Sequence, residues 1–139
     1  MVHINYFAVL ACAILSMVIG AIWYGPLFGR IWSKMSGVNP DDLEAIKKLQ
    51  KAARPMYLIQ FILTLFQVFV FAWYAASIPS ISVFSNAMLI WGAFIIPIVA
   101  GNAMWNNDSK DTAFARFFIQ AGYQLILFVV FALVITFWK

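Results

Sequence analysis

The chain has 139 residues, of which 65% are hydrophobic and only 10% are charged. Soluble domains carry roughly half hydrophobic and about a quarter charged residues, so this chain has too few polar groups to cover a soluble surface. Disordered chains are poor in aromatic residues and rich in charge, which is the reverse of this composition. Composition therefore excludes both classes and predicts an integral membrane protein.

Apart from Lys139, the charged residues fall in two windows, 30–54 and 108–116. The two windows leave four long uncharged stretches. At about 1.5 Å per residue, each stretch is long enough for a helix of roughly 30–35 Å, which matches a hydrocarbon core of about 30 Å. We therefore predict an all-α integral membrane protein that forms a single domain over residues 1–139. The four transmembrane helices are expected at residues 4–24, 56–78, 83–105 and 117–138.

Eight of the nine Lys and Arg residues lie in the first and third connections between these helices. The positive-inside rule places such connections in the cytoplasm, so both termini should face outward. We expect a multi-pass protein of the bacterial cytoplasmic (inner) membrane, with membrane lipids as partners. Nucleic-acid binding is excluded as an interpretation, because the basic residues have no soluble fold to display them.

The first connection, residues 25–55, has its own pattern. Pro26 cannot continue the first helix in regular form. Asn39 is a good N-cap and Pro40 suits the first helical position, so a short cytoplasmic interfacial helix is expected over 40–53. Pro55 should separate it from the second span. Such a helix is either a solvated connector, or a lid or docking site for anionic lipid or a partner.

An aromatic motif surrounds the end of the first span. Tryptophan and tyrosine prefer the headgroup level of a membrane, because their rings are apolar with one polar group. We therefore predict membrane anchoring, with Phe28 and Trp32 dipping into lipid. The motif comprises Trp23, Tyr24, Gly25, Pro26, Phe28, Gly29 and Trp32.

Polar residues inside the spans form stripes at helical spacing. An amide that faces lipid costs several kcal/mol, so the stripes should face each other, another helix or water. They are either contacts between helices or the lining of a polar cavity. The candidates are Gln60, Thr64 and Gln67 on the second helix, Gln120, Tyr123 and Gln124 on the fourth, Asn102 on the third and Ser16 on the first.

A ladder of small residues runs along the first helix, at Ala8, Cys12, Ser16 and Gly20. Such a face allows close helix approach, either within the bundle or between protomers. Because the ladder and the amide stripes compete for burial, we predict a symmetric homo-oligomer, most simply a dimer.

The sequence has few residues that could carry out catalysis or bind a cofactor. One cysteine and one histidine exclude a disulfide scaffold, a cysteine-based zinc site and a bis-histidine haem, so no cofactor or metal is expected. No charged residue lies within a span, which disfavours proton-coupled transport. The best hypothesis is non-enzymatic binding or passive transport of a small neutral polar solute through an amide-lined bundle. The alternative is an accessory or assembly protein that acts through helix–helix contacts, and a weaker one is a lipid-modifying enzyme.

A family resemblance rests on motifs spread along the chain. The sequence reads WYGPLFG at 23–29 with Trp32 after it, then Asp42-Leu43, Trp91-Gly92 and Gly122-Tyr123-Gln124. It resembles the bacterial membrane family called domain of unknown function 1761, whose members look like four-helix proteins of this length. Many members have Ser where Gly25 stands and often His where Gln124 stands. The family has no established activity, so the resemblance implies a topology rather than a mechanism.

Overall fold

The computed structural model describes residues 3–138, and within them every regular element is helical. The elements are α1 (Tyr6–Ile22), the π-helical turn η1 (Trp23–Leu27), α2 (Gly29–Met35), α3 (Leu43–Ser77), α4 (Val83–Ile90), the π-helical turn η2 (Trp91–Ile95), α5 (Ile96–Met104) and α6 (Lys110–Phe137). In this part of the chain, four continuous helical segments are long and apolar enough to cross a membrane: Tyr6–Leu27, Leu43–Ser77, Val83–Met104 and Lys110–Phe137. The prediction of an all-helical protein with four such helices is confirmed.

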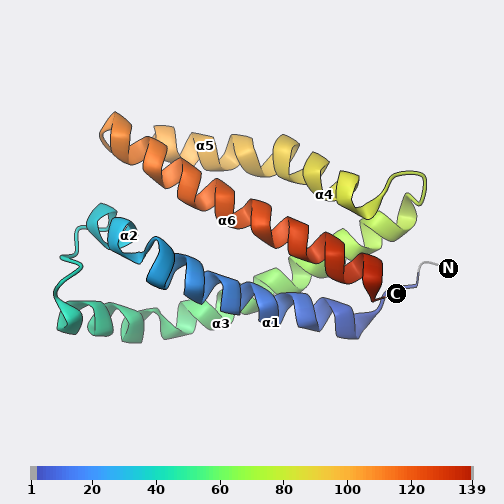
Figure 1. Ribbon diagram of the computed structural model, residues 1–139, viewed down its shortest axis with the longest axis horizontal. Coiled ribbons are helices and arrows are strands. Elements are labelled where there is room, and N and C mark those ends of the chain that lie inside the picture. The colour runs from blue at the N-terminus through green and yellow to red at the C-terminus, as the bar shows by residue number, and fades with distance from the viewer. Residues whose placement is uncertain (1–2, 139) are drawn as a thin grey trace.

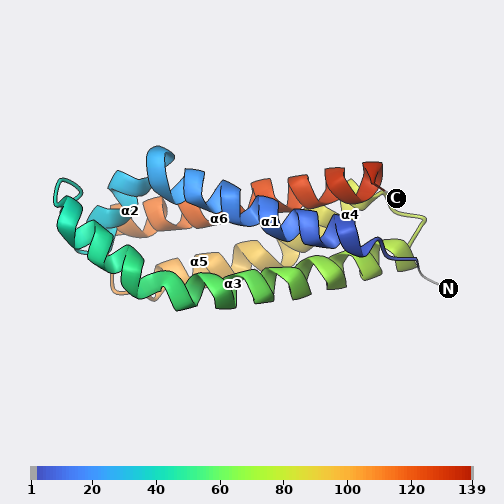
Figure 2. The same cartoon turned by 90° about the horizontal axis from the view of Figure 1, so that it is seen from below.

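The four long segments run side by side, and both chain ends lie at the same end of the bundle (Figure 1). The other end is formed by α2, the start of α3 and the connection between α5 and α6. We call it the basic end, because eight of the nine Lys and Arg residues belong to these segments or the first turns of α6. In Figure 2, α1 and α6 form one layer, and α3 and α5 form the other. Helix α1 packs against α3 and α6, and the third segment packs mainly against α6.

Helix starts follow ordinary capping chemistry. The side chain of Asn5 accepts hydrogen bonds from the backbone amides of Phe7 and Ala8 at the start of α1. Ser82 and Ser109 cap α4 and α6 in the same way. These side chains satisfy amide groups that have no partner inside the helix, which places the helix starts where the sequence changes from apolar to small polar residues.

The separate helix predicted over 40–53 does not form. Asp42, rather than Asn39, caps the helix by accepting from the amide of Ala45. From Leu43 onward the chain is one helix of 35 residues, with Pro55 inside it. Proline removes one hydrogen bond and bends a helix without necessarily ending it, and α3 bends between its first turns and its remainder (Figure 2). The predicted connector is therefore the beginning of α3, and the short helix between the first two spans is α2.

The two π-helical turns are built alike. In η1, the backbone amide of Phe28 donates to the carbonyl oxygen of Trp23 at 2.9 Å. In η2, the amide of Ile96 donates to the carbonyl of Trp91, with Pro97 directly after it. Each turn thus spans five residues, starts at a tryptophan and lies close to a proline that cannot donate in a regular helix.

The best-packed core lies away from the basic end. Phe71 of α3 and Phe128 and Phe131 of α6 are at most 3% exposed, and their rings pack edge to face. Cys12 of α1 and Ala87 of α4 complete the contact between the four segments. Large apolar side chains also cover much of the outer surface, as expected where the solvent is lipid.

Candidate functional site

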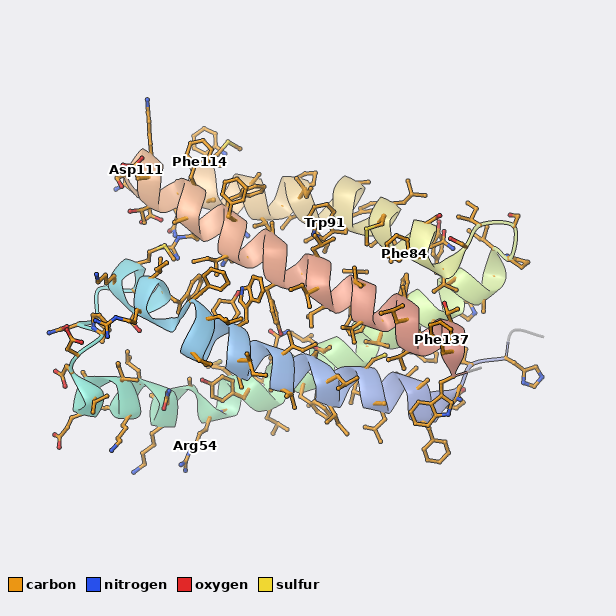
Figure 3. All side chains as sticks on the ribbon, viewed as in Figure 1. Arg54, Phe84, Trp91, Asp111, Phe114 and Phe137 are labelled. Carbon is orange, nitrogen blue, oxygen red and sulfur yellow. The ribbon has the colours of Figure 1, made fainter. Side chains whose placement is uncertain are left out.

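Two tryptophan side chains join the π-helical turns to α6. The indole Nε1 of Trp23 donates to the carbonyl oxygen of Ile119 at 2.9 Å, and Nε1 of Trp91 donates to that of Ala121 at 3.0 Å. Trp91 reaches from the third segment towards α6 (Figure 3). Both rings are half-buried. Trp23, predicted to be a membrane anchor, therefore also positions α6, and the two turns hold one short stretch of that helix from two sides.

Glycines make this arrangement possible. A Cβ atom on Gly122 would lie 3.2 Å from the ring of Trp23, and one on Gly29 would lie 2.8 Å from the backbone oxygen of Tyr24. Real Cβ atoms are essentially never found 2.8 Å from a backbone oxygen. Residue 29 must therefore be glycine where the chain turns back after η1. Around Gly25, by contrast, nothing lies within 4 Å.

The aromatic rings between Trp23 and Trp32 pack on one another and on α6. Trp23 contacts Phe28, with ring centroids 4.7 Å apart, and Tyr24 contacts Trp32 at 4.9 Å. Tyr24 also packs against Tyr123 of α6 at 5.3 Å. Phe28 and Trp32 are half-buried. The contacts of Tyr24 with Trp32 and Tyr123 join this aromatic motif to α6, and the insertion of Phe28 and Trp32 in lipid stays a prediction.

An ion pair closes the site at the basic end. Nε of Arg116 donates to a carboxylate oxygen of Asp108 at 2.8 Å, and the two side chains are only 14% and 19% exposed. The guanidinium carbon of Arg116 also lies 5.7 Å from the centre of the Trp32 ring. A charge so shielded from water is held in place by both contacts.

Beside this pair, an open groove of about 670 Å³ runs between α5 and α6. Its residues are Pro97, Ile98, Gly101, Asn102, Trp105, Asn106, Arg116 and Gln120. Two of the predicted polar residues, Asn102 and Gln120, therefore meet in one concave site. Asn102 and Asn106 are exposed, and Gln120 is half-buried.

The other predicted polar residues have different surroundings. Gln60 is exposed on α3 and donates to Thr64 of the same helix at 3.3 Å. Tyr123 donates to the carbonyl of Ser16 at 3.0 Å and so joins α6 to α1. Ser16 is buried and its hydroxyl donates to its own helix. These four residues contribute contacts rather than a shared lining.

The amides nearest the middle of the spans do not meet in the groove. Gln67 is half-buried on α3, and Gln124 is half-buried on α6 with its Oε1 enclosed and unpaired among the described residues. Neither residue lines the groove, so the two stripes do not share a lining there. The groove accordingly takes residues from the fourth and third segments and none from α3.

The ladder of small residues packs inside the protomer. Ala8, Cys12 and Ser16 are at most 2% exposed, and a Cβ on Gly20 would lie 3.0 Å from the hydroxyl of Tyr123. Of the two interpretations of this face, the structure favours contact within the bundle. A homodimer therefore has to use a different face.

Sequence reasoning overlooked three residues that matter here. Trp91 was identified only as part of the family motif and Arg116 only as a basic residue, although a tryptophan inside a span and an arginine beside a carboxylate both need partners. Asn86 of α4 is fully buried, and neither atom of its amide has a partner in the described part of the chain. The signal available for Asn86 was its position, as an amide within a predicted span.

A second cavity, of about 780 Å³, lies at the end of the bundle that holds the chain termini. Its walls are mainly small and apolar, with Ala8, Ala72, Ala75 and Val83 among them. It holds none of the predicted polar residues, and Ala8 is the one ladder residue among its walls. The groove at the basic end is therefore the better candidate for polar chemistry.

Comparison with known proteins gives one match. A family model described as "Protein of unknown function (DUF1761)" matches residues 7–136. This confirms the resemblance seen in the sequence. No curated protein and no solved structure matches the chain.

Proposed function

Because the chain belongs to this family of unknown function, we propose a function from the geometry alone: non-enzymatic binding of a small, net-neutral polar solute in the α5–α6 groove. The observation that carries the proposal is that three amide side chains, on Asn102, Asn106 and Gln120, line one groove. Amides that only joined helices would be bonded to the neighbouring helix. Amides open to a groove offer donors and acceptors to a ligand.

The charge of the groove supports a neutral ligand. Arg116 is the charged residue of the lining, and Asp108 pairs with it at 2.8 Å. The pair has no net charge, so a free ion gains little Coulomb energy there. A neutral molecule with several hydroxyl or amide groups can instead bond to each amide in turn.

Binding fits the packing better than passage through the bundle. The buried rings of Phe71, Phe128 and Phe131 fill the core between the helices. A solute that crossed the bundle would have to displace these rings. Passive transport is accordingly a second candidate, and the enclosed, unpaired Oε1 of Gln124 favours it.

The test uses saturation-transfer NMR on the purified protein in phosphatidylglycerol nanodiscs, with glycerol and urea as probes. Asn102→Leu and Gln120→Leu should each lower the transfer signal at least fivefold, because each removes a donor and an acceptor from the groove. Gln60→Leu is the matched control, since Gln60 is an exposed amide outside the groove, and it should leave the signal unchanged. Equal signals in all three variants, or no signal in the unmodified protein, would overturn the proposal.

Flux into liposomes separates binding from transport. If the protein only binds, glycerol should enter protein-containing and empty liposomes at the same rate. If it transports, Gln124→Leu and Gln67→Leu should slow entry while Gln60→Leu does not. A protein that neither binds nor conducts these probes would leave the assembly function as the better explanation.

A further inference from the structure

We infer that the occupant of the α5–α6 groove is the headgroup of a zwitterionic phospholipid, with its phosphate on Arg116 and its first acyl carbons along Pro97 and Ile98. This inference rests on the proposed function, since a zwitterionic headgroup is polar and has no net charge. It goes further by naming the class of molecule and the direction in which it lies.

The groove changes from apolar to polar along α5. Pro97 and Ile98 form its apolar part, and Asn102, Trp105 and Asn106 form the part nearer the basic end. At 1.5 Å per residue, the two parts are separated by about 6–12 Å along the helix. Ile98 is 61% exposed and Trp105 is 87% exposed, so the groove opens sideways onto the surface that faces lipid. A phospholipid has the same order, with a polar headgroup above apolar chains, whereas a water-soluble solute gains nothing from the apolar part.

Arg116 is placed to bind a phosphate. Its Nε donates to a carboxylate oxygen of Asp108, and its side chain lines the groove. The Trp32 ring on one side and Asp108 on the other fix the guanidinium beside the groove. Terminal guanidinium nitrogens bind phosphate oxygens in pairs, and this geometry is already built before a ligand arrives.

The pairing with Asp108 selects among headgroups. One phosphate added to a neutral ion pair gives the site a net negative charge. The ammonium group of phosphatidylethanolamine removes that charge, and it donates to carbonyl oxygens such as those of the amides of Asn102, Asn106 and Gln120. Phosphatidylglycerol has no positive group to do so, and its charge is repelled by Asp108.

Gly101 allows a sharp test. It lines the groove, and nothing lies within 4 Å of a Cβ built on it. Gly101→Leu should therefore fill the groove without straining the helix. Gly92 is the matched control, because it has the same open surroundings but lies outside the groove.

The experiment is native mass spectrometry of the full chain, released from mild detergent after equilibration with equal amounts of phosphatidylethanolamine and phosphatidylglycerol. We expect the unmodified protein to retain phosphatidylethanolamine at least fivefold more than phosphatidylglycerol. Gly101→Leu should lower this retention at least fivefold and Gly92→Leu should not. Arg116→Lys, which keeps the charge but removes the paired donors, should lower it about as much as Gly101→Leu, with circular dichroism confirming that each variant is folded.

Further arms identify which part of the inference fails. Equal retention of the two lipids, or equal loss in the two glycine variants, overturns the lipid assignment, while the glycerol and urea signals of Asn102→Leu still test the proposed function independently. Soluble glycerophosphoethanolamine should compete poorly, because it lacks acyl chains. If it displaces the lipid at equal concentration, the assigned role of Pro97 and Ile98 is wrong.

Discussion

The two halves of the bundle differ in how they use their side chains. Away from the basic end, buried Phe, Val and Ala side chains from all four segments fill the core, and helical geometry is regular. Towards the basic end, η1 and η2 interrupt regular helices, and half-buried aromatic rings and polar groups replace the apolar core. Irregular turns cost stability and recur at functional sites. One half therefore stabilises the fold, which allows the other half to keep an open groove lined by amides.

The largest expected difference between the two ends is in labelling from outside the cell. With Cys12 replaced by alanine, Ser80→Cys should react with an impermeant maleimide in intact cells, and Ser36→Cys should react only with a permeant one. Ser36 follows α2 at the basic end, and Ser80 lies in the connection between α3 and α4. The reverse pattern would invert the predicted orientation, although the groove would remain where it is.

In the regular half, Phe131→Ala should have the largest effect on stability. Phe131 is fully buried between Phe128 and its neighbours, and removing such a ring costs about 3–5 kcal/mol. We expect this loss in the free energy of unfolding measured in denaturant titrations, with glycerol binding by the folded fraction unchanged. A loss of binding as large as that of stability would show that the two halves are not independent.

Two glycines, Gly25 in η1 and Gly29 at the start of α2, make a matched pair. Gly29→Ala places a Cβ 2.8 Å from the Tyr24 backbone oxygen, whereas Gly25→Ala meets nothing within 4 Å. Overpacking of this kind costs about 1–3 kcal/mol, so Gly29→Ala should lower the unfolding midpoint and Gly25→Ala should not. If the two variants have equal midpoints, the return of the chain after η1 is less constrained than described.

The indole contacts to α6 should contribute less. Trp91→Phe keeps the ring but removes the donor to Ala121, and Trp23→Phe removes the donor to Ile119. Each should cost about 1 kcal/mol of stability and broaden the amide NMR signals of residues 119–124. Trp105→Phe is the control, because Trp105 is 87% exposed and its loss should not change stability. Sharp, unshifted signals in Trp91→Phe would mean that α6 is held by packing alone.

The smallest expected effect is an increase in stability. Asn86→Leu replaces a fully buried amide that has no partner among the described residues with an apolar side chain of similar size. Such an exchange is near neutral or stabilising, by about 1 kcal/mol. A clear loss of stability would instead reveal that the amide has a bound water or another partner in the folded protein.

Several features could be predicted from the sequence because they depend on solvent and length. The uncharged stretches around Ser16, Phe71 and Phe131 are long and apolar enough to cross lipid, and a helix is the single segment that satisfies its own backbone there. The clustering of basic residues predicted which connections share an end. Asn102 and Gln120 could be selected as candidate residues because an amide in a span needs a partner or water.

The remaining features depend on which helix lies beside which. In the sequence, Pro55 predicts a helix boundary. In the structure it lies inside α3 and bends this helix instead of ending it. The single hydrogen bond that the proline removes is outweighed by the helical turns on both sides. Periodicity predicts that the ladder through Ser16 faces a partner, but only the position of α6, with Tyr123 bonded to Ser16, shows that the partner is in the same chain. The position of the groove also depends on which helices lie side by side. Its residues come from helices joined by a short connection, and their open amides and shielded Arg116 follow from the tertiary placement of α5 against α6.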